Sequence, residues 1–364
     1  MIKFLSLSFV VIVLFSCNKT PPPVTPPADS TGTTPPPPPP PVVAKKWIVS
    51  TVAGSGQGGS ADGDSTQAQF LNAQGIAVDS HGNLVIGDQG NFSIRKISPA
   101  GHVTTYTNRS IMHSSFTFGN IYTLVVDKQD NIFTVEADFV RKIVSPDSSR
   151  FYGNLSVNYK DGWADTAAFD MIGNICIDRQ GNLFLPDYDR TNKWHVRKIT
   201  PAGFVSTLTL NDNTGFTSDL PITANLWYIY PIAVDSIGNL FVSANGGSMI
   251  KKIDINGNVS ILAGTGGLGF KDGTGTAAQF NNILGLACDA SGNVWVSDGN
   301  NSAIRRVTPA GAVTTIAGTG IMGFTNGDSS KAQFRYPFGI TVDKSGVVYV
   351  MDNGNNSVRK IEYK

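Results

Sequence analysis

The chain has 364 residues and a net charge of +1 at pH 7, with 28 Lys and Arg residues against 27 Asp and Glu residues. This balance argues against a nucleic-acid-binding protein, which needs an excess of basic residues to neutralise phosphates. The three cysteines are too few for a scaffold held together by disulfide bonds.

The first residues predict export. Residues 1–15 contain one basic residue, Lys3, followed by a run rich in Leu, Val, Ile and Phe. This run is too short to span a bilayer and is typical of a signal peptide, here residues 1–16. It ends in Leu14-Phe-Ser-Cys17, which resembles the cleavage motif of bacterial lipoproteins, so we expect Cys17 to become the lipidated first residue. The alternative is a signal peptide followed by a chance cysteine.

Residues 17–44 are expected to form a disordered tether. Residues 18–44 hold 12 of the chain's 20 prolines, including the run from Pro35 to Pro41. Such a segment cannot bury a core and adopts extended polyproline II, which rises ~3.1 Å per residue, so it would reach up to roughly 80 Å. We therefore expect a bacterial cell-envelope protein, held at the outer membrane by its lipid alone and facing the periplasm or the cell surface.

From residue 75 onward a short apolar pattern ending in Asp occurs six times. The copies are Gly75-Ile-Ala-Val-Asp79, Thr123-Leu-Val-Val-Asp127, Asn174-Ile-Cys-Ile-Asp178, Pro231-Ile-Ala-Val-Asp235, Gly285-Leu-Ala-Cys-Asp289 and Gly339-Ile-Thr-Val-Asp343. The terminal Asp residues lie 48, 51, 57, 54 and 54 residues apart. A period near fifty, built from short apolar runs and turn residues, predicts a radially repeated β structure.

Each copy predicts four antiparallel strands. The pentapeptide forms the first strand, and a Gly-Asn turn such as 80–83 leads to the second, because Gly and Asn accept the positive φ angles of tight hairpins. A third strand carries two adjacent basic residues, as in Arg305-Arg306, and a Thr- and Val-rich fourth strand follows. Four strands repeated six times predict an all-β fold, a six-bladed β-propeller.

The two ends of the propeller are predicted to join. The sixth copy stops at Lys364 before any fourth strand, whereas residues 47–56 match the fourth-strand ends 259–266 and 313–320. The N-terminal strand should therefore complete the last blade and remove an exposed sheet edge, so the propeller domain would comprise residues 45–364.

These repeats resemble those of the NHL-repeat family, with bacterial lipoprotein members as the nearest type. The connections between the repeats of this chain also match those of bacterial members, as in Asp272-Gly-Thr-Gly-Thr-Ala-Ala-Gln-Phe280. The resemblance covers residues 45–364 and implies a six-bladed propeller that acts as a binding or scaffold module. The family and related propellers also include an amidating lyase with metal-bound histidines and lactonases with acidic metal ligands. A metal-dependent hydrolase or lyase with its site at the central channel is therefore the alternative, although neither set of ligands maps onto matching positions here.

Most repeated polar residues are interpreted as structural. The Asp at the end of each first strand can cap the following turn, and the acidic residue nine positions later can pair with a third-strand Arg or Lys. The Asp62-Gly-Asp64 connection suggests Ca²⁺ only weakly, because it lacks a full ligand set, so no cofactor or metal site is predicted. Cys176 and Cys288 are expected to be small core residues that form no disulfide.

Function is expected where the repeats lose their symmetry. The loop between the second and third strands is longest in the third copy, and the connection before the fourth copy is irregular and aromatic. The candidate binding residues are Asp187, Tyr188, Asp189, Arg190 and Trp194 in that loop, and Trp227 and Tyr228 in that connection. Such rings can stack on sugars or anchor a protein, so we expect a monomer that binds a protein or glycan partner. The alternative is that these rings only cover the blade junction.

Overall fold

The structure, a computed structural model, describes residues 44–108, 121–136, 139–154, 159–188, 194–208 and 231–364. The chain divides into two compact units, Met1–Ala44 and Lys45–Lys364, and the second unit holds the fold. None of the helices in these described ranges has the length and apolar character that crossing a bilayer requires.

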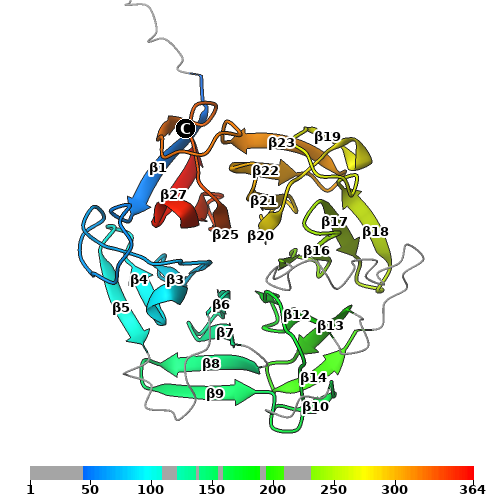
Figure 1. The fold of residues 1–364 in the computed structure, drawn as a ribbon. Coiled ribbons are helices and arrows are strands. Elements are labelled where there is room, and N and C mark those ends of the chain that lie inside the picture. The colour runs from blue at the N-terminus through cyan, green and yellow to red at the C-terminus, as the bar shows by residue number, and fades with distance from the viewer. Residues whose placement is uncertain (1–43, 109–120, 137–138, 155–158, 189–193, 209–230) are drawn as a thin grey trace, which may run out of the picture. The chain divides into compact units, whose positions relative to one another are not determined.

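Six antiparallel sheets surround a central channel, and the first strand of each sheet lies innermost (Figure 1). We number these blades 1 to 6, beginning with the copy that contains Asp79. Blade 1 consists of β2 (Gly75–Val78), β3 (Leu84–Asp88), β4 (Ser93–Ile97) and β5 (Val103–Asn108). Blade 2 consists of β6 (Leu124–Val126), β7 (Ile132–Glu136), β8 (Phe139–Ser145) and β9 (Ser148–Tyr152). Blade 3 consists of β11 (Cys176–Ile177), β12 (Leu183–Tyr188), β13 (Trp194–Ile199) and β14 (Phe204–Thr207).

The second half of the ring repeats this order. Blade 4 consists of β15 (Ile232–Val234), β16 (Leu240–Ala244), β17 (Met249–Ile253) and β18 (Val259–Ala263). Blade 5 consists of β20 (Ile283–Cys288), β21 (Val294–Asp298), β22 (Ala303–Val307) and β23 (Ala312–Ala317). Blade 6 consists of β25 (Pro337–Val342), β26 (Val348–Asp352), β27 (Ser357–Tyr363) and β1 (Trp47–Ala53). Single 3₁₀ turns occur at η1 (Gln89–Asn91), η2 (Gly275–Ala277) and η3 (Asn353–Asn355). The predicted six-bladed propeller is confirmed.

The N-terminal strand closes the ring as predicted. β1 pairs antiparallel with β27, from Trp47 opposite Tyr363 to Ala53 opposite Val358. The backbone N–H of Lys46 also donates to the carbonyl of Lys364 at 2.8 Å. Blade 6 therefore contains strands from both ends of the domain, and its sheet has no missing fourth strand.

Three blades carry a fifth strand that the sequence pattern did not predict. The short strands β10 (Gly162–Trp163), β19 (Gly273–Thr274) and β24 (Gly327–Asp328) pair with the outermost strands of blades 3, 5 and 6. Each belongs to the connection that leads into its blade, and this connection passes outside the fourth strand of that blade before it reaches the first strand. The connection thereby covers the outer edge of the sheet and satisfies edge hydrogen-bonding groups.

The Asp after each first strand organises the turn that follows. In blade 1, Oδ1 of Asp79 accepts hydrogen bonds from the backbone N–H groups of His81 and Asn83, and Oδ2 accepts one from the Asn83 side chain at 2.8 Å. Gly82 takes a φ of +80°, which glycine adopts without strain. The same Asp contacts recur at Asp127, Asp178, Asp235 and Asp289. The predicted capping role is confirmed.

In blades 1, 3, 5 and 6 a buried arginine on the third strand fastens the connection to its blade, and blade 5 illustrates the contacts. Arg305 donates to Asp298 at 2.6 Å and to Asp272 of the connection at 2.7 Å, and it also bonds two backbone carbonyls of the connection. The Cζ atom of Arg305 lies 5.0 and 5.2 Å from the ring centres of Phe270 and Phe280. The equivalent ion pairs are Arg95–Asp88, Arg141–Glu136, Arg197–Asp187 and Arg359–Asp352. The predicted pairing within a blade is confirmed in these blades.

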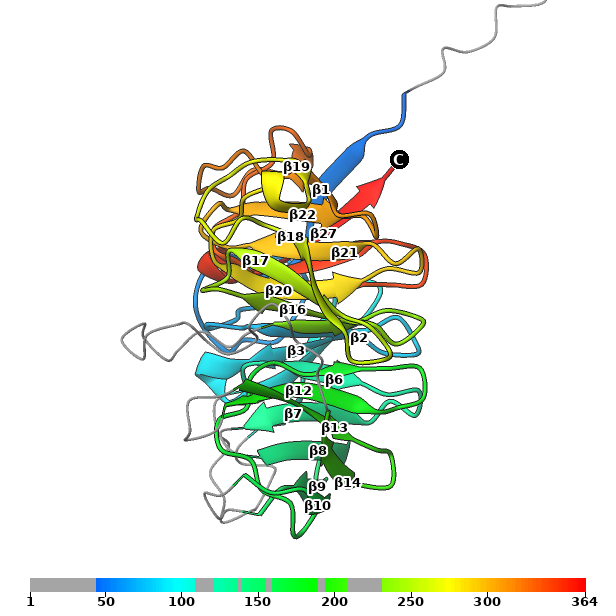
Figure 2. The same ribbon diagram turned by 90° about the vertical axis from the view of Figure 1, so that its right-hand side faces the viewer.

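The ring presents two different faces (Figure 2). The turn face carries the Asp-anchored turns and the turns between third and fourth strands, and β1 begins and β27 ends there. The connection face carries the loops between second and third strands and the connections between blades. These two names are used below.

Candidate functional site

The central channel is lined by the six first strands and has a volume of about 240 Å³. Most of its lining is apolar, with residues such as Ile76, Leu124 and Ile340. At the connection face the lining becomes polar, because Gln74, Tyr122 and Asn174 precede the first strands of blades 1, 2 and 3. The mouth of the channel is therefore the part that offers hydrogen bonds.

Cys176 and Cys288 both line this channel, and the structure records both as free thiols. Burial raises the pKa of each thiol, so both stay protonated at neutral pH. A protonated, buried thiol is a weak nucleophile and a weak metal ligand. Both cysteines are therefore interpreted as core residues.

The channel does not fit the metal that a lactonase-like or lyase-like site would need. Among the described residues that line it, no Asp, Glu or His is present. A catalytic zinc requires three protein ligands from His, Cys, Asp or Glu, and Ca²⁺ requires six or more oxygens. The two protonated cysteines and the neutral amides do not supply either set.

One group outside the channel has ligand-type side chains close together. Asp79, His81 and Asp130 place their ligand atoms within 4.8 Å of one another on the turn face. Asp79 already accepts hydrogen bonds from the turn, and Asp130 accepts two hydrogen bonds from Ser80, at 2.8 and 2.7 Å. These contacts explain the group as a link between the turns of blades 1 and 2.

The Asp62-Gly-Asp64 connection, which was considered for Ca²⁺, also uses its carboxylates for contacts within the protein. Asp62 accepts hydrogen bonds from Arg95 at 2.7 Å and from the backbone and side chain of Thr105. Oδ1 of Asp64 lies 3.0 Å from Nδ1 of His102, which is within hydrogen-bonding distance. The Asp62 oxygens therefore fix the connection to blade 1 and do not converge on an ion.

The long loop of blade 3 brings an aromatic corner to the connection face. Tyr188 and Trp194 pair across β12 and β13, and their ring centres are 4.9 Å apart. At the same end of these strands, but on the opposite face of the sheet, the rings of Tyr159 and His195 are 4.5 Å apart. Burial raises the pKa of Tyr159, and its hydroxyl already forms a hydrogen bond with Oγ1 of Thr207. We call Tyr159, Tyr188, Trp194 and His195 the aromatic corner.

The structure places the other predicted site residues as follows. Asp187 is fully buried, where it pairs with Arg197 and accepts hydrogen bonds from the backbone of residues 170 and 171. Burial raises the pKa of this carboxyl, against the lowering effect of Arg197. Asp187 thus supports the loop from below and is not part of its surface. Asp189, Arg190, Trp227 and Tyr228 lie outside the described residues, as does Cys17.

Another exposed aromatic pair lies away from the channel. Trp163, which is 56% exposed, sits on the outermost strand of blade 3, and its ring centre is 5.3 Å from that of Phe204. This pair covers the edge of the sheet. The rings of the aromatic corner, by contrast, are half-buried.

A cluster of carboxamides lies across blades 6 and 1 on the connection face. Gln89 Oε1 accepts hydrogen bonds from Asn72 at 2.6 Å and from Gln74 at 2.8 Å. Asn353 of blade 6 donates to Asn72 at 3.1 Å. The buried Oε1 atom of Gln74 accepts no hydrogen bond from the described residues. We call Asn72, Gln74, Gln89 and Asn353 the amide cluster.

The sequence interpretation missed the amide cluster because Asn72 and Asn353 are 281 residues apart and meet only when the ring closes. A signal was nevertheless present. Gln89, Tyr188 and Asn353 each stand ten residues after the Asp of their own copy. These residues therefore occupy one rim position in blades 1, 3 and 6, and a comparison of this position would have pointed to the mouth.

The connection face also exposes large apolar side chains. The connections before blades 5 and 6 contain Gly-Leu268-Gly-Phe270 and Ile321-Met322-Gly-Phe324, all five of these large side chains at least 43% exposed. Phe270 and Phe324 cover the guanidinium groups of Arg305 and Arg359. Leu268 and Ile321 are the most exposed of the five, at 64% and 66%, and they give the connection face an apolar surface.

Comparison with known proteins agrees with the fold. A family model for the NHL repeat matches residues 334–361, which lie in blade 6 and the connection before it. The Suppressor of quenching 1 protein of Arabidopsis thaliana is 29% identical over 132 residues, 34% of this chain and 12% of its own length. Teneurin-3 of Danio rerio is 24% identical over a 377-residue alignment that covers 87% of this chain and 13% of its own length. The chain thus spans about an eighth of the length of these curated relatives.

Several solved structures share the propeller. A protein of unknown function from Bacteroides thetaiotaomicron has a TM-score of 0.70 and 20% identity, covering 88% of this chain and 77% of its own. An auxiliary nutrient binding protein from Bacteroides ovatus has a TM-score of 0.67 and 17% identity, covering 88% and 78%. A gluconolactonase from Xanthomonas campestris has a TM-score of 0.55 and 13% identity, covering 81% and 87%. At these identities the similarity concerns the fold.

Proposed function

Because this chain is a six-bladed β-propeller that carries an NHL repeat, we propose that it is a binding module that captures a glycan at the connection-face mouth of its channel. The observation that carries this proposal is the combination of the amide cluster with the aromatic corner around one mouth. The acceptor Oε1 of Gln74 in the amide cluster is buried and has no partner among the described residues.

The chemistry of the mouth suits sugars. A carboxamide both donates and accepts hydrogen bonds, as a sugar hydroxyl does, and carries no charge that would have to be desolvated. An aromatic face offers a surface on which the C–H side of a sugar ring can stack. The solved structure of the Bacteroides ovatus nutrient-binding protein, which has the same fold, is consistent with a binding role.

The proposal includes anchoring of the module at the bacterial cell envelope. A lipid on Cys17 and the proline-rich residues 18–44 would tether the propeller to the outer membrane as a monomer. The described domain begins beside Lys364 on the turn face.

A protein partner is the second candidate, and the exposed Leu268 and Ile321 favour it. Apolar side chains of this kind are common at protein interfaces. A metal-dependent hydrolase or lyase is less favoured, because the described channel lining does not fit a metal.

Replacement of Trp194 by Ala tests the site. We expect capture of glycans from an array or a polysaccharide pull-down to fall about tenfold or more, because a desolvated aromatic contributes roughly 1–2 kcal/mol to binding. The melting temperature should stay nearly unchanged, since Trp194 is only half-buried. The matched control is Trp163→Ala, which removes an exposed ring from the outer edge and should leave capture unchanged.

The result also separates the candidates. A large loss of stability in Trp194→Ala with normal capture would mean that the ring only covers the blade junction. Capture of proteins but not of glycans, lost in Leu268→Ala or Ile321→Ala, would replace the glycan proposal by the protein one.

A further inference from the structure

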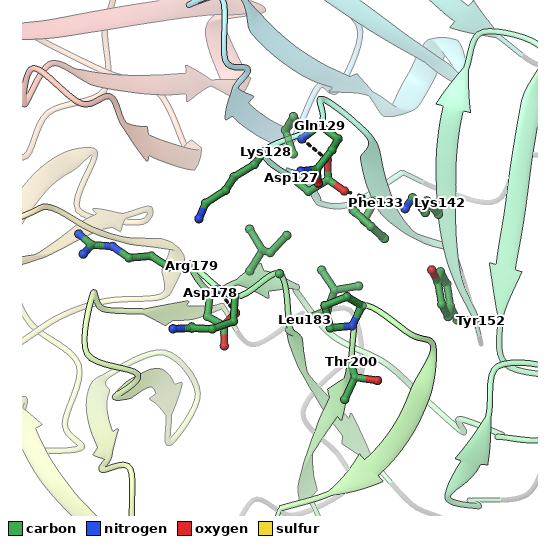
Figure 3. Close-up of a pocket in the computed structure, with 15 residues that line it drawn as sticks. Asp127, Lys128, Gln129, Phe133, Lys142, Tyr152, Asp178, Arg179, Leu183 and Thr200 are labelled. Atoms are coloured by element: carbon green, nitrogen blue, oxygen red, sulfur yellow. Dashed lines mark hydrogen bonds and ion pairs between the residues drawn. The ribbon is translucent and has the colours of Figure 1, made fainter.

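A groove of about 280 Å³ lies between blades 2 and 3 on the turn face, on the opposite side of the ring from the glycan mouth (Figure 3). Its walls are the Asp-anchored turns of the two blades. Phe133, Tyr152 and Leu183 line its outer part together with Thr200 and Lys142. The groove therefore combines apolar rings with several groups that can donate hydrogen bonds.

The groove contains both acidic and basic side chains, and the acidic ones do not neutralise all of the basic ones. Asp127 and Asp178 line it, but each directs its oxygens to its own turn. Asp127 accepts three hydrogen bonds of 2.7–2.9 Å from residues 129 and 131, and Asp178 accepts three of 2.7–2.9 Å from residues 180 and 182. Asp127 also pairs with Lys142 of the same blade at 4.0 Å, so that cation already has a partner.

Two cations remain. Lys128 and Arg179 follow these two Asp residues directly, are exposed, and extend in the same direction from adjacent turns (Figure 3). Neither forms an ion pair within the described part of the chain. An Arg fork beside a Lys is a common arrangement for binding a carboxylate or a phosphate group.

The fold does not require these cations. At the same turn position the other blades carry Ser80, Ser236, Ala290 and Lys344, so only blades 2 and 3 place two cations side by side. A similar groove between blades 6 and 1, of about 230 Å³, is lined by Tyr349, Lys360 and small polar residues and lacks this pair. The cation pair is thus a local departure from the repeat rather than a part of the scaffold.

We propose that this groove is a second binding site, which takes a sugar-sized anion. A carboxylate or phosphate on the ligand would bind Lys128 and Arg179, which extend from the two turns toward the ring axis (Figure 3). The rest of the ligand would lie between the two turns, at the inner end of the groove. The volume admits one small ring rather than a polymer.

Isothermal titration of the purified full-length chain tests the site with three probes: glucuronate, glucose 6-phosphate and glucose. We expect at least one anionic sugar to bind about tenfold or more tightly than glucose, because hydrogen bonds to ionised groups are the strong ones. Binding should weaken as salt is raised. Tighter binding of glucuronate would identify a carboxylate site, and tighter binding of glucose 6-phosphate would identify a phosphate site.

Variants decide whether the groove is responsible. Lys128→Gln together with Arg179→Gln should weaken anion binding about tenfold or more, with an unchanged melting temperature because both side chains are exposed. Lys344→Gln, at the same turn position of blade 6, should bind as the natural chain does.

The proposal is overturned if neither anion binds, if glucose binds equally well, or if the double variant binds normally. An equal loss in Lys344→Gln would also overturn it, since that result indicates general surface charge. Failure of these tests leaves the glycan mouth unaffected, because the two sites lie on opposite faces.

Discussion

At the scale of single residues, the buried arginine is the clearest case of chemistry used for structure. Arg305 is fully buried, but its guanidinium is bonded to two Asp side chains and to backbone carbonyls. A buried charge of this kind is tolerated because counter-charges and hydrogen-bond acceptors lie around it, although the buried Nε of Arg305 has no partner among the described residues. Blade 4 carries Ala244 and Lys251 at the two positions, so the chain changes both members of the pair together.

The first residue-scale prediction follows from this pairing. Asp298→Ala should lower the free energy of unfolding by about 3–5 kcal/mol, because it leaves the buried Arg305 without its nearest counter-charge. Urea denaturation of the purified protein measures this change.

Asp272→Asn is the matched control. In blade 6 the corresponding residue is Asn326, which accepts a hydrogen bond from Arg359 at 2.8 Å. An Asn at position 272 should therefore be tolerated, with a loss of about 1 kcal/mol or less. Equal losses in the two variants would contradict the view that Asp298 is the main counter-charge.

At the scale of elements, strand β1 has the largest consequence. It comes from the start of the domain but forms the fourth strand of the last blade, between β27 and β24. The strand buries Val49 and Ala53 and places Trp47 against Trp295 of blade 5, with ring centres 5.5 Å apart. It therefore joins two blades as well as the two ends of the chain.

Removal of β1 should destabilise the domain. A chain that begins at Gln57 leaves β27 as an exposed edge, so the unfolding free energy should fall by several kcal/mol and aggregation should increase. Differential scanning calorimetry and light scattering measure both effects. A chain that begins at Lys45 is the control and should melt like the full-length protein, and equal melting of the two truncated chains would contradict the closure argument.

At the scale of the whole molecule, the repeats build a symmetric ring and the exceptions to the repeat mark the sites. The aromatic corner belongs to the longest second-to-third strand loop, and the two cations of the groove replace residues that are small and uncharged in three of the other four turns. Loops on a rigid scaffold commonly carry function in this way. The two proposed sites occupy opposite faces, so one ring can hold two ligands at once.

The lipid anchor is the whole-molecule prediction. Cys17→Ser should move the protein from the membrane to the soluble fraction of lysed cells, because acyl chains would supply the attachment. Cys288→Ser is the control and should remain with the membrane. Membrane association of the Cys17→Ser protein, with its signal peptide removed, would contradict lipidation at this cysteine.

The sequence alone determined the ring. The period of about fifty residues defined the blades, and the match of residues 47–56 to later fourth strands predicted which ends would meet. The Asp-anchored turns were also predictable, because Asp79 bonds residues only two and four positions away. These features are local or strictly periodic, so they can be read without knowing how the blades lie in space.

Only the tertiary structure decided which polar residues share a surface. Asp187 and Tyr188 are neighbours in the sequence, yet one is fully buried against Arg197 and the other lies at the connection face. Asn72 meets Asn353 only after the ring has closed, and Lys128 and Arg179 share a groove because adjacent blades bring their turns together. Such pairs depend on the alternation of side chains along strands and on the arrangement of the blades, which the spacing of residues along the chain does not contain.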